Sequence, residues 1–299
     1  MDPKHEKREV SVKGKERIMK RRKEKSQFRE YAESIILAVI LALVMRQFVV
    51  QAFKIPSGSM EETLLIGDHI LVNKFLYHFA KPKRFDVIVF QYPWEEDRDF
   101  IKRVIGLPGD TVQLRNRQVY VNGQPLEEPY AQYAPAQSRE QNFGPVVVPK
   151  KGDVVEIRDQ QLYLNGEPVP IPPGRFYPRD GGMAMTGFEV FYSTLSGFSA
   201  GATLDRPAGP FTVQHDYYFM LGDNRDNSKD SRYWGFVQDG SDRCYWGLLR
   251  CPQIKGNAFF IYWSWNRSGH LVDHIRWDRL GKLLGLDPPG RLLVREKAP

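Results

Sequence analysis

The sequence contains few of the residues that build metal centres. Six histidines stand at positions 5, 69, 78, 215, 270 and 274, and no two of them have the His-Glu-x-x-His spacing of a zinc enzyme. The acid-rich stretch after Leu221 departs from a calcium loop, because Arg225 occupies a ligand position and Ser228 replaces the required glycine. We therefore predict no metal site and no cofactor. Only two cysteines are present, Cys244 and Cys251, which allow one disulfide at most.

Excess positive charge is scarce outside the first 30 residues. Residues 1–30 hold 12 Lys and Arg against 6 Asp and Glu, whereas the remaining 269 residues hold 31 against 30. The net charge of +7 therefore belongs almost entirely to an N-terminal tail. A nucleic-acid groove needs its basic excess on the folded part, so we predict no nucleic-acid partner. With 41% hydrophobic and 26% charged residues, most of the chain is expected to fold.

Only one long apolar run follows this tail. Ile35–Met45 is 11 residues long, which is short of the roughly 20 residues that a membrane-spanning helix needs. Apolar residues continue beyond Arg46 as far as Phe53. A helix from about Ala32 to Phe53 spans a bilayer if Glu33 and Arg46 reach the two interfaces.

Three interpretations of this run compete. A cleaved signal peptide needs a small-x-small site after the run, but the chain reads Arg46-Gln47-Phe48 there. A buried core helix leaves the twelve preceding basic residues unexplained. An uncleaved anchor agrees with the positive-inside rule, which predicts a cytoplasmic tail (residues 1–30), a transmembrane segment (31–53) and an outer location for the rest.

The remainder of the chain is punctuated for β structure. Short apolar runs such as Ile70–Val72, Val87–Phe90 and Tyr217–Leu221 alternate with clusters of Gly, Pro, Asn and Asp. This pattern predicts a mainly β fold, with one further short helix near Arg276–Leu284.

An internal repeat lies within this β-rich part. Residues 109–126 align with residues 152–169 at an offset of 43, and 9 of 18 positions are identical. Each copy alternates apolar and polar residues over two short strands and closes with Asn-Gly, a pair suited to tight turns with positive φ. Two copies are too few for a solenoid. We therefore predict two similar hairpins in an inserted subdomain (residues 111–213), without chemistry of their own.

Three segments carry residues suited to catalysis, around Ser57 and Ser59, around Lys102, and from Gly222 to Gly235. None of them contains a histidine, so a Ser-His-Asp triad has little support. The first two also have an ordinary interpretation, Ser-Gly-Ser as a turn and Lys102 as a strand lysine whose ammonium reaches water.

A serine nucleophile without histidine needs another base. Lysine serves if burial among apolar neighbours lowers its pKa from about 10.4 towards neutrality. Phe100 and Ile101 are such neighbours of Lys102. The hydroxyl of Ser228 is suited to orient the amine, and the Ser57 hydroxyl with the Ser59 backbone N–H is suited to form an oxyanion hole.

Four motifs decide between these interpretations. They resemble, in the same order, the conserved boxes of bacterial type I signal peptidases, and they are Pro56–Met60, Gly67–Phe75, Ile101–Asp110 and Gly222–Gly235. The chain departs from that family at Glu62, where proline is usual, and in a local duplication at 236–252, where Tyr245-Trp-Gly echoes Tyr233-Trp-Gly. Cys244 and Cys251 lie in this duplication, where they form a disulfide in an oxidising compartment or remain free thiols.

The resemblance implies a role for each matching residue. Ser59 would be the acylated nucleophile, Lys102 the general base, Ser57 an oxyanion-hole donor, and Ser228 the group that positions Lys102. Asp230 and Arg232 would form a supporting ion pair. The residues that match the shallow pockets for small side chains at −1 and −3 of a signal peptide are Phe53, Ile55, Met60, Phe100 and Ile101. Because Ser59 follows the anchor so closely, we expect the apolar residues around it to form an exposed patch at the membrane.

The expected protein is thus a single-pass serine endopeptidase of the bacterial inner membrane. It would remove signal peptides from exported preproteins on the outer side of this membrane, cutting after Ala-x-Ala sequences. Its partners would be preprotein signal peptides and membrane phospholipid. An antiparallel β-sheet core would comprise residues 54–110 and 214–275, followed by a C-terminal segment (276–299). Two rivals are a membrane-anchored β-rich binding module without activity, and a self-cleaving repressor-type Ser–Lys protease, which would need a DNA-binding domain in place of the anchor.

Overall fold

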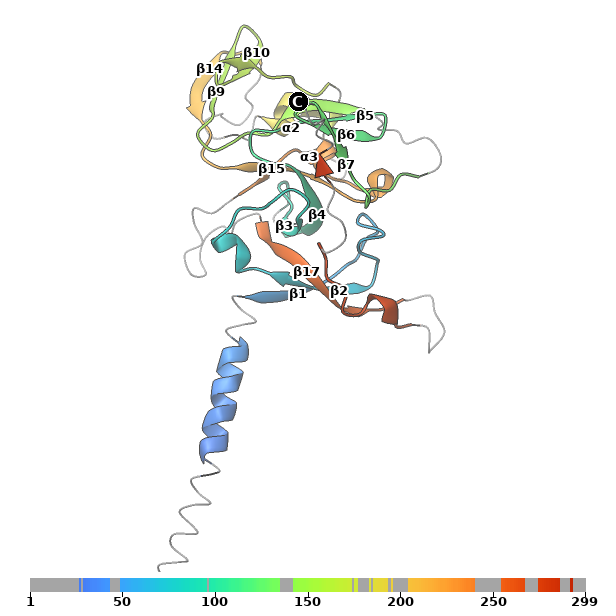
Figure 1. Cartoon of the computed structure of the whole chain (residues 1–299). Coiled ribbons are helices and arrows are strands. Elements are labelled where there is room, and N and C mark those ends of the chain that lie inside the picture. The colour runs from blue at the N-terminus through green and yellow to red at the C-terminus, as the bar shows by residue number, and fades with distance from the viewer. Residues whose placement is uncertain are drawn as a thin grey trace, which may run out of the picture. The chain divides into compact units, whose positions relative to one another are not determined.

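The computed structural model comprises two units, Met1–Val50 and Gln51–Pro299 (Figure 1). It describes residues 27, 29–43, 49–95, 97–134, 142–173, 175–176, 183, 185–192, 195, 204–239, 254–266, 274–285 and 291–292. Most of the basic tail, residues 44–48 of the expected anchor, and both cysteines with most of the local duplication lie outside the described residues.

In the first unit, residues 29–43 form a helix whose apolar side chains are exposed, from Ile35 to Leu43. Arg29 and Glu33 form an ion pair one turn apart at its start. Among the helices that the structure describes, none combines the length and the apolar character needed to cross a membrane.

The second unit is built around a seven-stranded sheet with the order β1-β2-β17-β3-β4-β15-β16. The pairs from β2 to β16 are antiparallel. Its strands are β1 (Val50–Lys54), β2 (Asp68–Asn73), β3 (Val87–Gln91), β4 (Asp99–Gly106), β15 (Tyr217–Leu221), β16 (Val237–Gln238) and β17 (Ile254–Ser264). The prediction of a mainly β fold with an antiparallel sheet is confirmed.

Two smaller sheets have the orders β18-β7-β6-β5-β8 and β11-β10-β9-β14. All their strands except β18 come from the segment between β4 and β15. The first contains β5 (Thr111–Arg115), β6 (Gln118–Val121), β7 (Gln124–Glu127), β8 (Phe143–Val147) and β18 (Arg291–Leu292). The second contains β9 (Val154–Arg158), β10 (Gln161–Leu164), β11 (Glu167–Pro168) and β14 (Ala208–Thr212). The predicted limits of the inserted subdomain stay a prediction, since the contacts divide the chain only near residue 50.

The repeat seen in the sequence is repeated in the hydrogen bonds. Asn122 Oδ1 accepts from the Thr111 N–H at 2.8 Å, and Asn165 Oδ1 accepts from the Val154 N–H at 2.8 Å. Both asparagines have positive φ, as the Asn-Gly turns predict, and each is followed by a glycine with positive φ. The two copies are therefore the same hairpin built twice.

The structural repeat extends further than the sequence repeat, because a fourth strand joins each hairpin. β8 pairs with β5 and β14 pairs with β9, each with a bulge at the equivalent place. Gly144 and Gly209 lie at these bulges with φ of 80° and 98°. An added Cβ would lie 2.9 Å from the Val112 carbonyl oxygen in the first copy and 2.7 Å from the Val155 carbonyl oxygen in the second.

The remaining elements are short. They are η1 (Leu76–His78), β12 (Arg175–Phe176), β13 (Met185–Thr186), α2 (Gly187–Phe191), η2 (Arg225–Asn227), α3 (Ser231–Trp234) and η3 (Trp277–Arg279). The helix expected near Arg276–Leu284 is wrong, because only the single 3-10 turn η3 forms there. The backbone of this segment bonds to β17 instead. The Leu284 N–H donates to the Phe259 carbonyl, and the Gly281 N–H donates to the Ile261 carbonyl.

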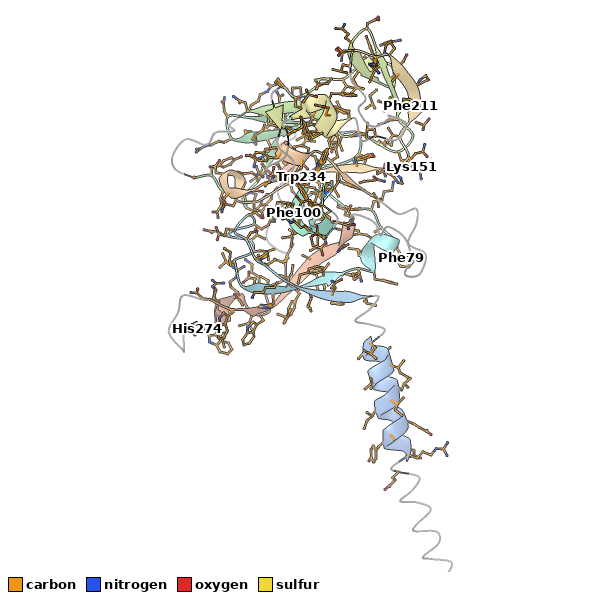
Figure 2. The ribbon with its side chains drawn as sticks, turned by 180° about the vertical axis from the view of Figure 1, so that it is seen from behind. Phe79, Phe100, Lys151, Phe211, Trp234 and His274 are labelled. Atoms are coloured by element: carbon orange, nitrogen blue, oxygen red, sulfur yellow. The ribbon has the colours of Figure 1, made fainter. Side chains whose placement is uncertain are left out.

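Three clusters of buried side chains hold the second unit together. The largest joins the two smaller sheets and α2 to β15. A second packs Ile55, Met60 and Leu64 against β2 and β3. The third includes Phe90, Tyr92, Met220 and Trp234, and Phe100 packs against it (Figure 2). The strand β4 runs between the second and third clusters, so its side chains reach both.

Candidate active site

Ser59 lies in the loop that connects β1 to β2. The loop is closed by backbone hydrogen bonds from Ile55 to Asp68 at 2.8 Å and from Gly67 to Ile55 at 3.0 Å. Met60 and Leu64 are fully buried, and the Leu64 N–H donates to the Met60 carbonyl at 2.7 Å. The residues after Ser59 therefore anchor the loop in the second cluster and fix the serine, which is 7% exposed.

Lys102 reaches this serine from the middle of β4. Its Nζ atom lies 2.7 Å from Ser59 Oγ and 2.9 Å from the Ile101 carbonyl oxygen. The lysine is 4% exposed. Burial lowers the pKa of its amine to about 8, and the negative charges of Asp230 and Asp223 limit this fall. Near neutral pH a much larger fraction of this amine than of a free lysine is thus unprotonated, and an unprotonated amine can accept the serine proton.

Asp230 and Arg232 form an ion pair beside the two residues. Arg232 Nε lies 2.8 Å from Asp230 Oδ1 and its Nη2 lies 3.0 Å from Oδ2, while the Gly222 N–H donates to Oδ2 at 3.1 Å. Burial alone would raise the pKa of Asp230, but Arg232 outweighs burial and holds it below its ordinary value. Both charges are therefore satisfied within the protein interior.

Ser228 lies next to Ser59 across the backbone of Gly222. A Cβ atom added to Gly222 would lie 2.1 Å from Ser228 Oγ and 2.6 Å from the Ser59 carbonyl oxygen. The Ser228 hydroxyl is buried, and it has no hydrogen-bond partner of good geometry among the described residues. It is nevertheless close enough to Asp230 to help lower the pKa of that carboxyl group. The resemblance implies that Ser228 positions Lys102, but no hydrogen bond joins these two described side chains.

Ser57 and the expected pocket residues differ in how far they are exposed to solvent. Ser57 is exposed, two residues before Ser59. Ile55 and Met60 are 2% and 0% exposed, and Phe53 and Ile101 pack against the same cluster.

Phe100 lies on the other side of β4, with its ring 5.5 Å from Lys102 Nζ and stacked on Tyr92 at 4.5 Å. The expected exposed patch is therefore wrong for Ile55 and Met60. Contacts with Ile70, Val72 and Val89 bury them in the core instead.

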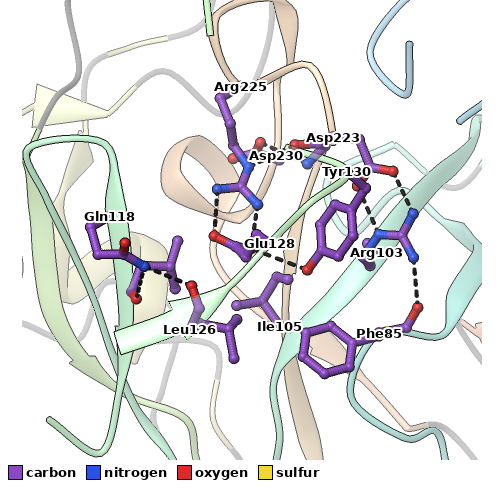
Figure 3. Close-up of polar contacts among 12 residues, drawn as sticks. Phe85, Arg103, Ile105, Gln118, Leu126, Glu128, Tyr130, Asp223, Arg225 and Asp230 are labelled. Atoms are coloured by element: carbon purple, nitrogen blue, oxygen red, sulfur yellow. Dashed lines mark hydrogen bonds and ion pairs between the residues drawn. The ribbon is translucent and has the colours of Figure 1, made fainter. Parts of the chain in front are cut away.

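Arg103 was missed by the sequence analysis, although it is the neighbour of Lys102. Its Nε and Nη2 atoms lie 2.8 Å and 2.5 Å from the two oxygens of Asp223 (Figure 3). Thr63 Oγ1 donates to the same carboxylate at 2.6 Å. Alternation along a strand would have located Arg103 on the face opposite Lys102, but its partner is 120 residues away.

Asn224 was also missed. Its backbone N–H donates to the Ser59 carbonyl at 3.1 Å, and its side-chain amide donates to the Gly58 carbonyl at 3.1 Å. Two adjacent carbonyls of the serine loop are thus held by one residue of the fourth motif, Gly222–Gly235. In the part of the chain that the structure describes, no group of three or more His, Cys, Asp or Glu is arranged to hold a metal ion.

Most of the chain matches one known protein family. The model of "Signal peptidase, peptidase S26" matches residues 28–151 and 146–263. The chain belongs to this family. "Signal peptidase I" of Pseudomonas aeruginosa is 33% identical over 249 residues, which are 79% of this chain and 72% of that protein. The resemblance drawn from the four motifs is confirmed, and the protein is a peptidase.

Two further relatives come from other bacteria. "Signal peptidase I" of Aquifex aeolicus is 35% identical over 258 residues, covering 79% of this chain and 84% of the relative. "Signal peptidase I P" of Bacillus subtilis subsp. natto is 35% identical over 244 residues, covering 82% and 93%. The similarity therefore spans most of both chains in each case.

Proposed function

We propose that the protein is a membrane-bound serine endopeptidase that removes signal peptides from exported preproteins, with Ser59 as nucleophile and Lys102 as general base. The observation that carries this proposal is the 2.7 Å contact between Lys102 Nζ and Ser59 Oγ inside the protein. Family membership supports the substrate class, since the relatives are called signal peptidases. A nucleophile within hydrogen-bond reach of its base is the geometry that acyl transfer requires.

The reaction would proceed in two halves. Ser59 Oγ attacks the carbonyl carbon of the scissile peptide bond while the neutral amine of Lys102 accepts its proton. The negative oxygen of the tetrahedral intermediate is stabilised by the Ser57 hydroxyl and the Ser59 N–H. The Lys102 ammonium then gives its proton to the leaving amine, and the signal peptide remains as an ester on Ser59. Water attacks this ester, Lys102 takes the water proton, and that proton returns to Ser59 as the ester breaks.

Two carboxylates offset part of the cost of the charge that Lys102 gains in this cycle. In the resting site burial disfavours the ammonium, which keeps the amine available as a base. When the amine takes up the serine proton, Asp230 and Asp223 stabilise the new positive charge from a distance. The same environment therefore supplies a base in the ground state and tolerates the acid that follows.

An extended preprotein segment has a place to bind beside this pair. The pairing of β15 with β4 ends at Arg103, so the backbone of Asp99–Ile101 is paired with β3 alone among the described strands. A peptide that adds to a strand in this way gains backbone hydrogen bonds. Ile55 and Met60 are buried in the core, so the surface beside them would be shallow. It would admit only small side chains at positions −1 and −3 of the signal peptide.

Membrane association is proposed from both units separately. In the first, the exposed apolar side chains of residues 35–43 follow a basic tail, as expected for an anchor with a cytoplasmic N-terminus. In the second, Trp265 and Trp277 are 39% and 68% exposed. Exposed indole rings are typical of protein surfaces that contact phospholipid. The catalytic residues would then act at the outer face of the bacterial inner membrane.

Incubation of the detergent-solubilised full chain with a preprotein carrying an Ala-x-Ala site tests the proposal. Mass spectrometry of the products should show one cut after the −1 alanine, and a Ser59→Ala chain should leave the preprotein intact. A preprotein that is bound but not cut by the wild-type chain would contradict the proposal and favour a binding module.

A further inference from the structure

A segment that follows the first repeat copy crosses the fourth motif, Gly222–Gly235, beside the active site. It comprises residues 128–134, here called the strap, and it follows β7 directly. The Gln132 N–H donates to the Asp223 carbonyl at 2.7 Å, and the Arg225 N–H donates to the Gln132 carbonyl at 2.9 Å. The Ala134 N–H donates to Asp226 Oδ2 at 2.6 Å. The strap is thus joined by its backbone to the loop that contains Gly222 and Asn224.

The strap also supplies a buried carboxylate to this loop. Arg225 Nη1 lies 3.0 Å from Glu128 Oε2, and Nη2 lies 2.5 Å from Oε1 (Figure 3). The side chains are 0% and 6% exposed, so the pair is shielded from water. Burial opposes the charge of Arg225, but Glu128 outweighs it and raises the pKa of the guanidinium. Tyr130 Oη adds a hydrogen bond to Glu128 Oε1 at 3.2 Å.

Arg225 transmits this contact to the two reacting residues. Its Nε donates to the Gly222 carbonyl at 3.0 Å. Gly222 in turn is packed between Ser228 Oγ and the Ser59 carbonyl oxygen, too closely for a Cβ atom. Two residues, Arg225 and Gly222, therefore lie between Glu128 and the backbone of the nucleophile.

A second contact of the strap reaches the strand that carries Lys102. The ring of Tyr130 lies 3.9 Å from the Arg103 guanidinium carbon. Arg103 is bound to Asp223, which follows Gly222 in the same loop. The strap thus contacts both the loop that contains Gly222 and the strand β4, which carries Lys102.

We propose that Glu128 is a positioning residue of the active site, which acts through Arg225 to hold Gly222 and the Ser59 loop in register. The inference rests on the proposed peptidase function. It also gives the predicted inserted subdomain, which contains Glu128, a part in the chemistry, although the repeated hairpins themselves still have none. The second copy offers the contrast, because the position 43 residues after Glu128 is Ile171, which carries no charge and packs against the largest cluster.

Three variants of the full chain test this role, with cleavage of an Ala-x-Ala preprotein as the assay. Glu128→Gln keeps the shape of the side chain but removes its charge. Glu128→Asp keeps the charge, and Glu167→Gln is the matched control on an exposed residue of the second copy. We expect Glu128→Gln to lower kcat about 10- to 100-fold with KM changed less than about twofold, because small misplacements of reacting groups cost rate rather than binding. Glu128→Asp should recover most of the loss.

Removing one member of a buried pair also destabilises a fold, so kcat is expressed per folded molecule, measured by thermal unfolding of each variant. Glu128→Leu combined with Arg225→Met removes both charges, which avoids an unpaired one. It should fold and still have a low kcat, since Gly222 has lost its donor. Wild-type kcat per folded molecule in Glu128→Gln or in this double variant would overturn the inference. A wild-type chain that fails to cut the preprotein would instead overturn the proposed function.

Discussion

Lys102 and Arg103 are neighbours on β4 and are both buried, yet the protein treats their positive charges in opposite ways. They are 4% and 6% exposed. Burial lowers the pKa of the Lys102 amine to about 8. Burial also acts against the charge of Arg103, but its hydrogen bonds to Asp223 outweigh this effect and raise the pKa. Alternation along the strand directs the two side chains to opposite faces, and each meets a different set of partners.

The difference between the faces is the availability of a carboxylate. On the Arg103 face, both oxygens of Asp223 are bound to the guanidinium. On the Lys102 face, the nearest polar partners are a hydroxyl and a backbone carbonyl. Asp230 lies nearby, but Arg232 and the Gly222 N–H bind its oxygens. A buried cation without its own counter-ion becomes a base, whereas one with a counter-ion becomes part of the scaffold.

The strongest way to break this contrast is to make the first residue like the second. Lys102→Arg places a group that stays protonated in proteins beside Ser59, so no base remains. We expect cleavage to fall at least about a thousandfold, as it should in Ser59→Ala, because the two residues act as a unit. Rates of preprotein cleavage by each variant and by the double variant measure this. A Lys102→Arg chain with more than about a hundredth of wild-type kcat contradicts the assignment of the base.

Removing the second cation should affect stability most. Arg103→Ala leaves Asp223 buried and unpaired, and such a loss costs about 3–5 kcal/mol of folding free energy. Urea unfolding of wild type and variant gives the difference. Lys255→Ala removes a more exposed lysine paired with Asp99 and serves as the control, with an expected loss below about 1 kcal/mol. Equal losses in both variants would refute the account of Arg103.

A smaller loss of kcat is expected in Gly222→Ala, beside the serine loop. The added methyl group in Gly222→Ala collides with Ser228 Oγ and the Ser59 carbonyl, 2.1 Å and 2.6 Å from the new Cβ. We expect kcat to fall about 10- to 100-fold, because the reacting groups must shift. Gly152→Ala, where nothing lies within 4 Å of the new atom, controls for the loss of glycine flexibility. An unchanged kcat in Gly222→Ala would show that this packing does not position Ser59.

The smallest expected effect separates the two faces of the strand directly. Phe100 lies on the Lys102 face, 5.5 Å from Nζ, and Ile101 lies on the other. Phe100→Ala admits water to the amine, so its pKa should rise from about 8 towards the ordinary value near 10.4. Less free base remains at neutral pH, and kcat should fall severalfold there. The pH profile of Ile101→Ala should keep the wild-type inflection, and a shift of equal size in both variants would rule out this explanation.

Much of this site could be predicted from the sequence, because its parts lie in short motifs. Ser59, Lys102 and the Asn-Gly hairpins each depend on residues close to one another in the chain. Arg103–Asp223 and Glu128–Arg225 pair over separations of 120 and 97 residues, so no local pattern indicates them. The burial of Ile55 and Met60 was missed for the same reason, since the strands that cover them are distant in sequence.

The pH dependence of kcat/KM tests the central claim most directly, that Lys102 is a neutral base because it lacks a bound counter-ion. The account predicts that the rate of preprotein cleavage rises with pH to an inflection near 8, where burial has brought the pKa of the Lys102 amine. The control is an NMR titration of the amine in Ser59→Ala, which should show the same lowered pKa. An amine that titrates near the ordinary lysine value of about 10.4 would contradict the account.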